Sequence, residues 1–167
     1  MDKNSPNCEI CERSFKSGRA KLIHYTRIHE KKDITPIAGF SKCGDPRCMT
    51  CKKGIFVNEL LITETKETHK ITQPITCKTS NLVYCITCLK CRDQYIGETG
   101  QELHRRQSGH INDIKEKRTG LPYVRHFLKC GIDNYSITGV EKVRSRDPQI
   151  RKQREGFYKK LFKVKIK

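Results

Sequence analysis

Two cysteines and two histidines near the start of this 167-residue chain have the spacing of metal ligands. Cys8 and Cys11 are separated by two residues, and His24 and His29 follow after a twelve-residue gap. The short gap lets two thiolates reach one ion from a tight turn, and histidines about one helical turn apart present both imidazoles on one side of a helix. These four residues therefore predict a structural zinc site.

The same stretch, residues 1–32, resembles a ββα zinc finger of the C2H2 type. Phe15 stands at the usual aromatic core position of such a finger. By this resemblance the base-reading positions are Ser17, Ala20 and Ile23. None of these side chains can make the bidentate contacts that discriminate bases, and a lone finger spans only about three base pairs. We therefore expect a weak DNA contact, a protein contact or a purely structural unit, and not the source of sequence specificity.

Three further cysteines lie close together among turn-forming residues in the middle of the chain. They are Cys43, Cys48 and Cys51. A tetrahedral thiolate site needs a fourth ligand, and Cys77 is the nearest candidate. Two expected strands, over 56–64 and 69–72, would form a hairpin that returns Cys77 to the other three. We expect a four-cysteine zinc site here. The alternative is a set of free thiols in a loop, which is a redox liability.

Residues 82–97 contain two runs of β-forming residues on either side of a polar loop, which predicts a strand hairpin. Because side chains alternate along a strand, Tyr84 and Ile86 fall on one face, and Val83 and Cys85 fall on the other. A tyrosine on a strand usually indicates only a half-buried β-forming position. Its chemistry depends on what the next element places beside it.

That next element is a helix expected from Leu103 to about residue 117. Its inward stripe combines two apolar residues with Arg106 and His110, at spacings of three, four and four residues. Arg105 lies about 100° around the helix and should face solvent. An inward arginine is costly unless it has an anionic partner. We favour a phosphate clamp for Arg106; the alternative is a buried salt bridge to a carboxylate.

Three more elements complete the C-terminal half. The first two are a short helix over 124–129 and a strand over 135–143. The third begins at Asp147, where an N-cap residue followed by proline is a strong helix start. This last helix carries Glu155, which either serves a site or forms an ordinary ion pair with Arg151.

Composition points to a polyanionic partner and to metal ions in place of a large core. Only 35% of the residues are hydrophobic, and the chain has no tryptophan. A net charge of +17 favours nucleic acid over a membrane surface, the alternative being a merely soluble basic surface. The polar N-terminus lacks an apolar signal region, and no apolar run reaches the ~20 residues of a membrane span. We therefore expect a reducing compartment, nuclear or cytoplasmic with the nucleus preferred, and no membrane partner.

The order and spacing of these residues resemble the GIY-YIG nuclease family. Tyr84 stands at the end of the first half-motif, and a literal Tyr-Ile-Gly begins at Tyr95 after ten intervening residues. The resemblance covers residues 81–162 and is greatest to the endonuclease domain of Penelope-like retroelements. Those domains carry a Cys-x-x-Cys between the half-motifs, and Cys88 and Cys91 occupy that place here.

The resemblance implies hydrolysis of a DNA phosphodiester with one Mg²⁺ or Mn²⁺ ion. Glu155 would bind that ion. Tyr84 would activate or position the attacking water, and Tyr95 would hydrogen-bond near the scissile phosphate. Arg106 would stabilise charge on the phosphoryl oxygens. His110 would either assist proton transfer or act as a zinc ligand.

The resemblance also implies a zinc site made by Cys88 and Cys91 with a downstream histidine, His126. His110 is one candidate for the fourth ligand of that site. A histidine cannot hold a zinc ion and act at the phosphate at the same time, so the sequence leaves its role open.

We therefore expect an α/β (α+β) protein in three parts. They are a zinc finger over 1–32, a linker and Cys-rich hairpin segment over 33–80, and a GIY-YIG-like domain over 81–167. The last would contain a small three-stranded antiparallel sheet flanked by helices. The expected function is a metal-dependent DNA endonuclease of retroelement origin. The alternative is a zinc-binding nucleic-acid-binding or adaptor protein that keeps the fold without the chemistry, and it is favoured by the lack of an asparagine that the family often has after the glutamate helix.

Overall fold

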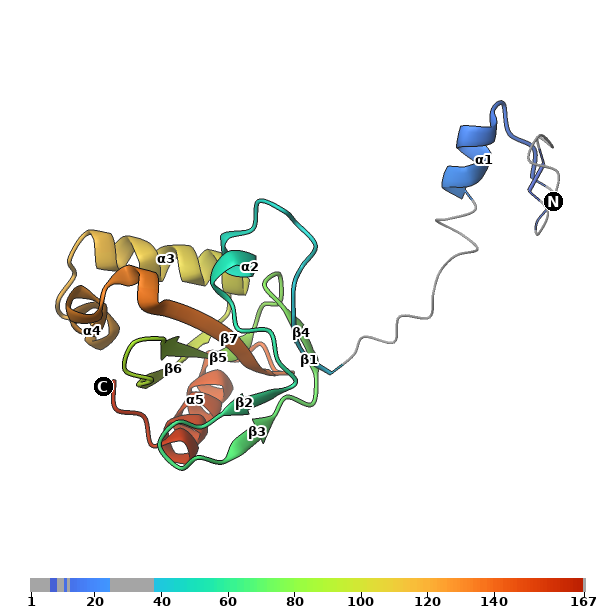
Figure 1. Ribbon diagram of the computed structural model, residues 1–167. Coiled ribbons are helices and arrows are strands. Elements are labelled where there is room, and N and C mark those ends of the chain that lie inside the picture. Colours follow the sequence, from blue (N-terminus) through green and yellow to red (C-terminus); the bar gives the residue numbers. More distant parts are fainter. Residues whose placement is uncertain (1–6, 9–10, 12, 25–37, 167) are drawn as a thin grey trace. The chain divides into compact units, whose positions relative to one another are not determined.

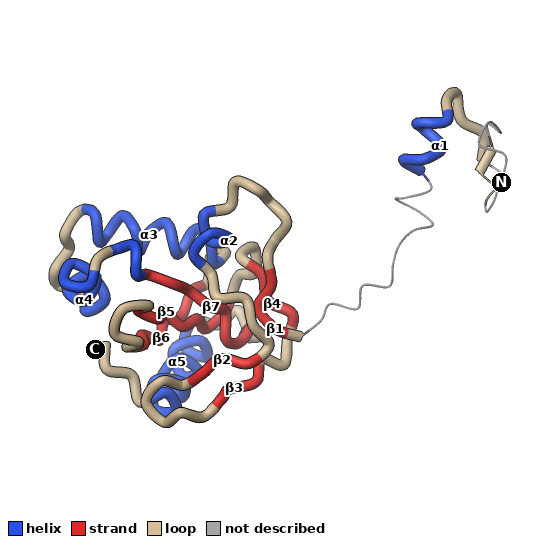
Figure 2. Tube along the Cα trace, in the orientation of Figure 1, coloured by secondary structure: helices blue, strands red, loops and turns tan. Residues whose placement is uncertain are grey.

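A computed structural model describes residues 7–8, 11, 13–24 and 38–166 (Figures 1 and 2). The chain divides into two compact units, Met1–Pro36 and Ile37–Lys167. Each unit is described by itself. The predicted zinc ligand His29 lies outside the described residues.

The described part of the first unit contains an antiparallel bridge between Asn7 and Ser14, followed by helix α1 (Gly18–His24). The hydroxyl of Ser17 accepts a hydrogen bond from the Ala20 backbone amide, which satisfies one of the unpaired donors at the start of the helix. Within the described residues, an antiparallel bridge followed by a helix agrees with the ββα arrangement predicted for a finger.

The second unit is built on a three-stranded antiparallel sheet in the order β6-β5-β7. The strands are β5 (Leu82–Cys88), β6 (Gln94–Thr99) and β7 (Tyr135–Lys142). Every residue of β5 is buried, because this strand is central and both of its faces are covered. The predicted hairpin and small antiparallel sheet are confirmed.

Helices cover both faces of this sheet (Figure 1). One face carries α3 (Leu103–Lys115) and α4 (Pro122–Cys130), which pack against Tyr84 and Ile86 of β5. The other face carries α5 (Pro148–Phe162), which packs against the alternate residues of β5. This division follows the strand alternation predicted from the sequence.

Helix α5 begins where the sequence predicted. Asp147 is its N-cap, and the Asp147 carboxylate accepts a hydrogen bond of 2.8 Å from the Gln149 backbone amide. A 3₁₀ turn, Ile132–Asn134, joins α4 to β7.

The segment before β5 belongs to the same compact unit as the sheet. Strand β1 (Gly39–Ser41) pairs in parallel with β4 (Pro74–Thr76), and α2 (Met49–Lys53) lies between them in sequence. Phe40, Ile71 and Ile75 share the core that contains Tyr84. Residues 38–80 are therefore part of the sheet domain's core and not a separate hairpin segment beside it.

The predicted hairpin in this segment is present but shorter than expected. It consists of β2 (Glu59–Leu61) and β3 (Thr68–Lys70), which pair antiparallel. Its buried Leu60 packs with the core on the α5 side of the sheet. Among the described residues, none of the helices combines the length and apolar character needed to cross a bilayer.

Candidate active site and metal centres

Tyr84 is buried at the centre of the predicted site, with 1% of its surface exposed. It lies on β5, opposite Gly97 of β6 and Gly139 of β7. A Cβ atom at Gly97 would lie 2.5 Å from the Tyr84 hydroxyl oxygen and 2.6 Å from its ring. The glycine of the Tyr-Ile-Gly sequence is therefore required by the tyrosine of the neighbouring strand. Sequence reasoning did not identify this packing role.

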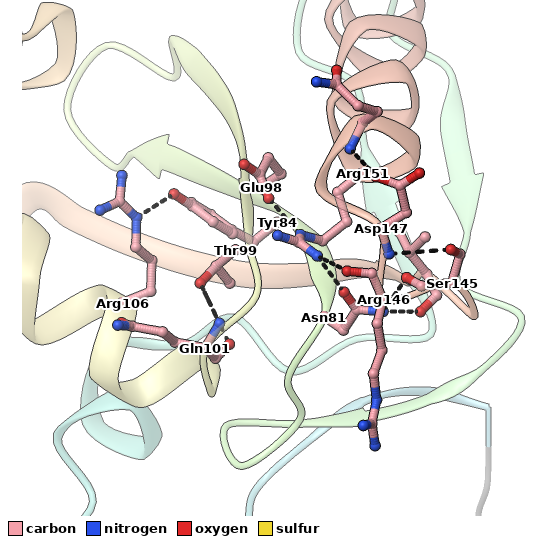
Figure 3. Close-up of polar contacts among 12 residues, drawn as sticks. Asn81, Tyr84, Glu98, Thr99, Gln101, Arg106, Ser145, Arg146, Asp147 and Arg151 are labelled. Atoms are coloured by element: carbon pink, nitrogen blue, oxygen red, sulfur yellow. Dashed lines mark hydrogen bonds and ion pairs between the residues drawn. The ribbon is translucent and has the colours of Figure 1, made fainter.

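Arg106 and His110 both contact the Tyr84 hydroxyl group. Arg106 Nε donates a hydrogen bond of 3.1 Å to the Tyr84 oxygen (Figure 3). His110 Nε2 lies 2.7 Å from the same oxygen. Arg105 of the same helix has a side chain that is 71% exposed, so the helical period correctly distinguished the two arginines.

The charges of this group fix the direction of its hydrogen bonds. Burial, followed by the positive charge of Arg106, lowers the pKa of His110 to about 3, so the imidazole is neutral. Burial raises the pKa of Tyr84, an effect that Arg106 opposes. Because Arg106 donates to the Tyr84 oxygen, the Tyr84 proton is left to be donated to His110 Nε2. The proton of the neutral imidazole is then on Nδ1, an atom that is buried and without a partner within the described chain.

Tyr95 and Tyr123 extend the group along one side of His110. The Tyr123 ring meets the His110 ring edge-on at a centroid distance of 4.3 Å, and Tyr95 lies 5.5 Å from Tyr123. Tyr123 donates a hydrogen bond to the Asp113 carboxylate. Burial raises the pKa of Tyr95, and the negative charge of Glu155 raises it further. Tyr95 therefore lies near enough to Glu155 and to Arg106 for both charges to act on its hydroxyl.

Glu155 lies on α5, and its side chain is 19% exposed. Its carboxylate forms an ion pair of 3.0 Å with Lys159, one helical turn away. The alternative pairing with Arg151 that the sequence left open is therefore wrong. Glu155 is thus a single, mostly buried carboxylate that already has a cationic partner.

Arg151 instead ties the start of α5 to the sheet (Figure 3). Its Nε donates a hydrogen bond of 2.7 Å to the Glu98 carboxylate on β6, and its Nη1 donates to the Asn81 side-chain oxygen at 2.8 Å. Nη1 also donates to the Arg146 carbonyl at 2.9 Å. Arg151 is thus a buried ion-pair partner that links three parts of the chain one turn before Glu155.

Asn81 completes this anchor. Its backbone has a φ of 60°, in the left-handed region that asparagine tolerates better than most residues. Its Nδ2 donates to the carbonyls of Val143 and Ser145, which lie in the turn before α5. Sequence reasoning missed this network. The sequence signal that could have identified Arg151 is an arginine at the start of the apolar face of α5. An arginine on an apolar helix face is also the signal that identified Arg106.

A candidate metal centre lies where the β5–β6 loop meets the end of α4. Its members are Cys88, Cys91, His126 and Cys130, with ligand atoms that all lie within 4.8 Å of one another. Cys91 Sγ is 3.4 Å from His126 Nε2, close to the ~3.6 Å edge expected between sulfur and nitrogen in a tetrahedral zinc site. The fourth position is filled by Cys130, four residues after His126. His110 is not in this group, because it is held against Tyr84.

The second centre brings together Cys43, Cys48, Cys51 and Cys77, as the sequence predicted. The Sγ atoms of Cys43 and Cys51 are 3.7 Å apart, and those of Cys51 and Cys77 are 3.3 Å apart. Disulfide sulfurs would be about 2.05 Å apart, whereas the sulfur–sulfur edge of a tetrahedral zinc site is about 3.8 Å. A hydrogen bond from the Asp45 backbone amide lowers the pKa of the Cys43 thiol to about 7, which favours the thiolate that a metal needs.

The first unit brings Cys8, Cys11 and His24 within the same 4.8 Å limit. Cys11 Sγ lies 3.2 Å from His24 Nε2, and the Phe15 ring packs on the His24 ring at a centroid distance of 4.6 Å. The two four-residue centres have the donors and spacing that structural zinc requires, and the described part of the first unit supplies three such donors.

Searches of family models, curated proteins and solved structures found no match to this chain. The geometry of the site offers a neutral imidazole hydrogen-bonded to a tyrosine hydroxyl, a guanidinium beside them, and a carboxylate on α5 whose charge acts on Tyr95.

Proposed function

We propose that this protein is a metal-dependent endonuclease that hydrolyses phosphodiester bonds in DNA, as its resemblance to GIY-YIG nucleases implies. The observation that carries the proposal is the joint contact of Arg106 and His110 with the Tyr84 hydroxyl, at 3.1 and 2.7 Å. These three residues come from two elements, β5 and α3. A buried histidine and a partly buried arginine are costly to place beside a core unless they serve a site.

In this proposal the chain's own groups position the attacking water and stabilise the phosphate charge. Neutral His110 accepts the hydrogen bond of the Tyr84 hydroxyl and so orients the Tyr84 oxygen, which would accept a hydrogen bond from the attacking water. Arg106 uses only Nε for Tyr84 in the structure. Its two Nη groups are therefore left for the phosphoryl oxygens, which suit a forked donor.

Tyr95 and Glu155 complete the proposed site on the β6 side. The Tyr95 hydroxyl would donate a hydrogen bond near the scissile phosphate. Glu155 would hold a Mg²⁺ or Mn²⁺ ion, which when bound supplies charge stabilisation for the leaving oxygen. Lys159, which neutralises Glu155 in the structure, is the cation that the metal would replace.

The charge distribution supports DNA as the partner. Residues 141–167 contain eleven lysines and arginines against three acidic residues. Contacts of this kind fix the position of a backbone and strengthen binding without reading sequence. The nuclear location that we infer for the protein follows from this choice of substrate.

The alternative is a nucleic-acid-binding or adaptor protein that keeps the fold without cleavage. Two observations favour it: Tyr84 is only 1% exposed, and Glu155 is already paired with Lys159. In this reading the polar group would be an inert part of the core.

A nicking assay on supercoiled plasmid separates the two functions. Arg106→Ala should lower the rate by about 100-fold or more, the usual cost of removing a donor to a developing negative charge. The matched control is Arg105→Ala, on the same helix but facing solvent, which should stay within a few-fold of wild type. DNA binding is measured in parallel at one salt concentration. If both variants nick as fast as wild type, the catalytic proposal is wrong.

A further inference from the structure

We infer that a zinc ion at the four-cysteine cluster fixes the position of α3 and, through α3, the contacts of Arg106 and His110 with Tyr84. The cluster comprises Cys43, Cys48, Cys51 and Cys77. The consequence for cleavage rests on the proposed function, but the structural coupling does not.

The coupling begins at Cys77, which is a ligand candidate and also a cap for α3. The first backbone amides of an α-helix have no partner within the helix. In α3 two of them bond to the segment that follows β4: His104 N donates to the Cys77 carbonyl at 2.9 Å, and Leu103 N donates to the Thr79 carbonyl at 3.0 Å. The residue before the helix, Glu102, supplies no side-chain cap. The backbone carbonyls of Cys77 and Thr79 therefore cap the start of α3 in place of a side chain.

The side chain of His104 strengthens this link. Its Nδ1 lies 3.2 Å from the same Cys77 carbonyl. The turn itself is tight, because Thr79 Oγ1 accepts from the Thr76 amide at 2.9 Å and the Thr79 amide donates to the Thr76 carbonyl at 3.0 Å. A displacement of Cys77 is therefore passed to the start of α3 and not absorbed by a loose loop.

The cluster in turn decides where Cys77 lies. Cys43 follows β1, Cys51 lies in α2, and Cys77 directly follows β4. A bound ion would cross-link three separate elements at one point. Strands β1 and β4 are only three residues long, and short pairings of this kind contribute little stability by themselves. Cys77 is fully buried, so its thiol has no water to interact with when the ion is absent.

The coupling reaches the candidate active site through α3. Arg106 is two residues after His104, and His110 is one further helical turn along. Hydrogen bonds weaken steeply once the heavy atoms separate beyond about 3.5 Å, so a shift of the α3 axis by about 1 Å would break both contacts with Tyr84. The metal cluster is thus a positioning device for the proposed catalytic arginine.

Hydrogen exchange on the full chain tests this inference with two matched variants. Cys48→Ser removes one candidate ligand of the four-cysteine cluster that lies outside the 77–79 turn. Cys91→Ser removes one candidate ligand of the centre that contains Cys88. Metal content is measured on each protein. We expect Cys48→Ser to lose one zinc ion per chain and the amides of Leu103 and His104 to exchange about tenfold faster, since two hydrogen bonds are weakened. Cys91→Ser should leave these two amides unchanged.

Unchanged exchange at Leu103 and His104 in a Cys48→Ser protein that has lost its zinc overturns the inference. So does a Cys43→Ser/Cys48→Ser protein that keeps the wild-type metal content, because the cluster then holds no ion. If β7 amides lose protection as well, the variant is globally unfolded. In that case Cys48→His, which retains a zinc donor, is used in place of Cys48→Ser. Protection of the Leu103 and His104 amides must then rise and fall with zinc content across the variants.

Nicking by the same proteins separates this inference from the proposed function. If exchange is faster in Cys48→Ser but the wild type does not nick DNA, the structural coupling is supported and only the nuclease proposal is wrong. Faster exchange together with a loss of nicking of at least tenfold is the result that both predict.

Discussion

Replacing Gly97 by alanine is expected to destabilise the protein by about 2–3 kcal/mol. The new Cβ would lie 2.5 Å from the Tyr84 hydroxyl oxygen, about 1 Å inside ordinary contact. Overpacking a closed core costs about 1–3 kcal/mol. Any rotation of Tyr84 that relieves the clash also weakens its hydrogen bonds to His110 and Arg106, each contributing about 1 kcal/mol.

The matched control is Gly109→Ala, in the interior of α3. A Cβ there meets nothing within 4 Å, so alanine should stabilise the helix by about 0.5–1 kcal/mol. Urea unfolding of the zinc-loaded proteins, followed by circular dichroism, measures both changes. The two glycine variants should shift the unfolding midpoint in opposite directions. A Gly97→Ala protein within 0.5 kcal/mol of wild type would refute the close packing of Gly97 on Tyr84.

Three further predictions concern His110, Arg151 and Cys130. The pKa of His110 is about 3 in the folded protein. As pH falls below about 6.5, His110 therefore takes up a proton in the unfolded chain but not in the folded one. The free energy of unfolding should then drop by up to about 1.4 kcal/mol per pH unit. The stability lost between pH 7 and pH 5 should be smaller in His110→Gln, and an equal loss in both proteins contradicts the neutral histidine. Arg151→Met, which leaves Glu98 and Asn81 unpaired, should lower stability by about 1–2 kcal/mol in thermal unfolding, whereas exposed Lys152→Met should change it by less than about 0.5. Cys130→Ser should weaken one zinc ion against a competing chelator in native mass spectrometry, and zinc retention equal to wild type would exclude Cys130 as a ligand.

Periodic patterns made the sheet and helices predictable. Tyr84 and Arg106 could be placed because each lies in an element with one repeated face, and the period fixes which side chains point inward. The grouping of Cys8, Cys11 and His24 was predictable for a similar reason, since local spacing determines whether side chains can reach one ion.

Contacts made only by the tertiary fold were not predictable. Cys130 reaches the Cys88 centre because α4 ends beside the β5–β6 loop, and the sequence gives no measure of that distance. Arg151 forms its ion pair with Glu98 on β6 and not with Glu155 on its own helix. The three-residue strands β1 and β4 are too short for a periodic signal, so the inclusion of residues 38–80 in the sheet domain's core could not be seen.

The most direct test of the proposed function is plasmid nicking as a function of Mg²⁺ concentration by wild type and Glu155→Gln. The variant keeps the size of the side chain and removes the charge that would hold the ion. The nuclease proposal predicts cleavage by wild type that EDTA abolishes, and a rate at least 100-fold lower for Glu155→Gln with DNA binding retained. Equal cleavage by the two proteins, or DNA binding by wild type without cleavage at any Mg²⁺ concentration, would contradict it.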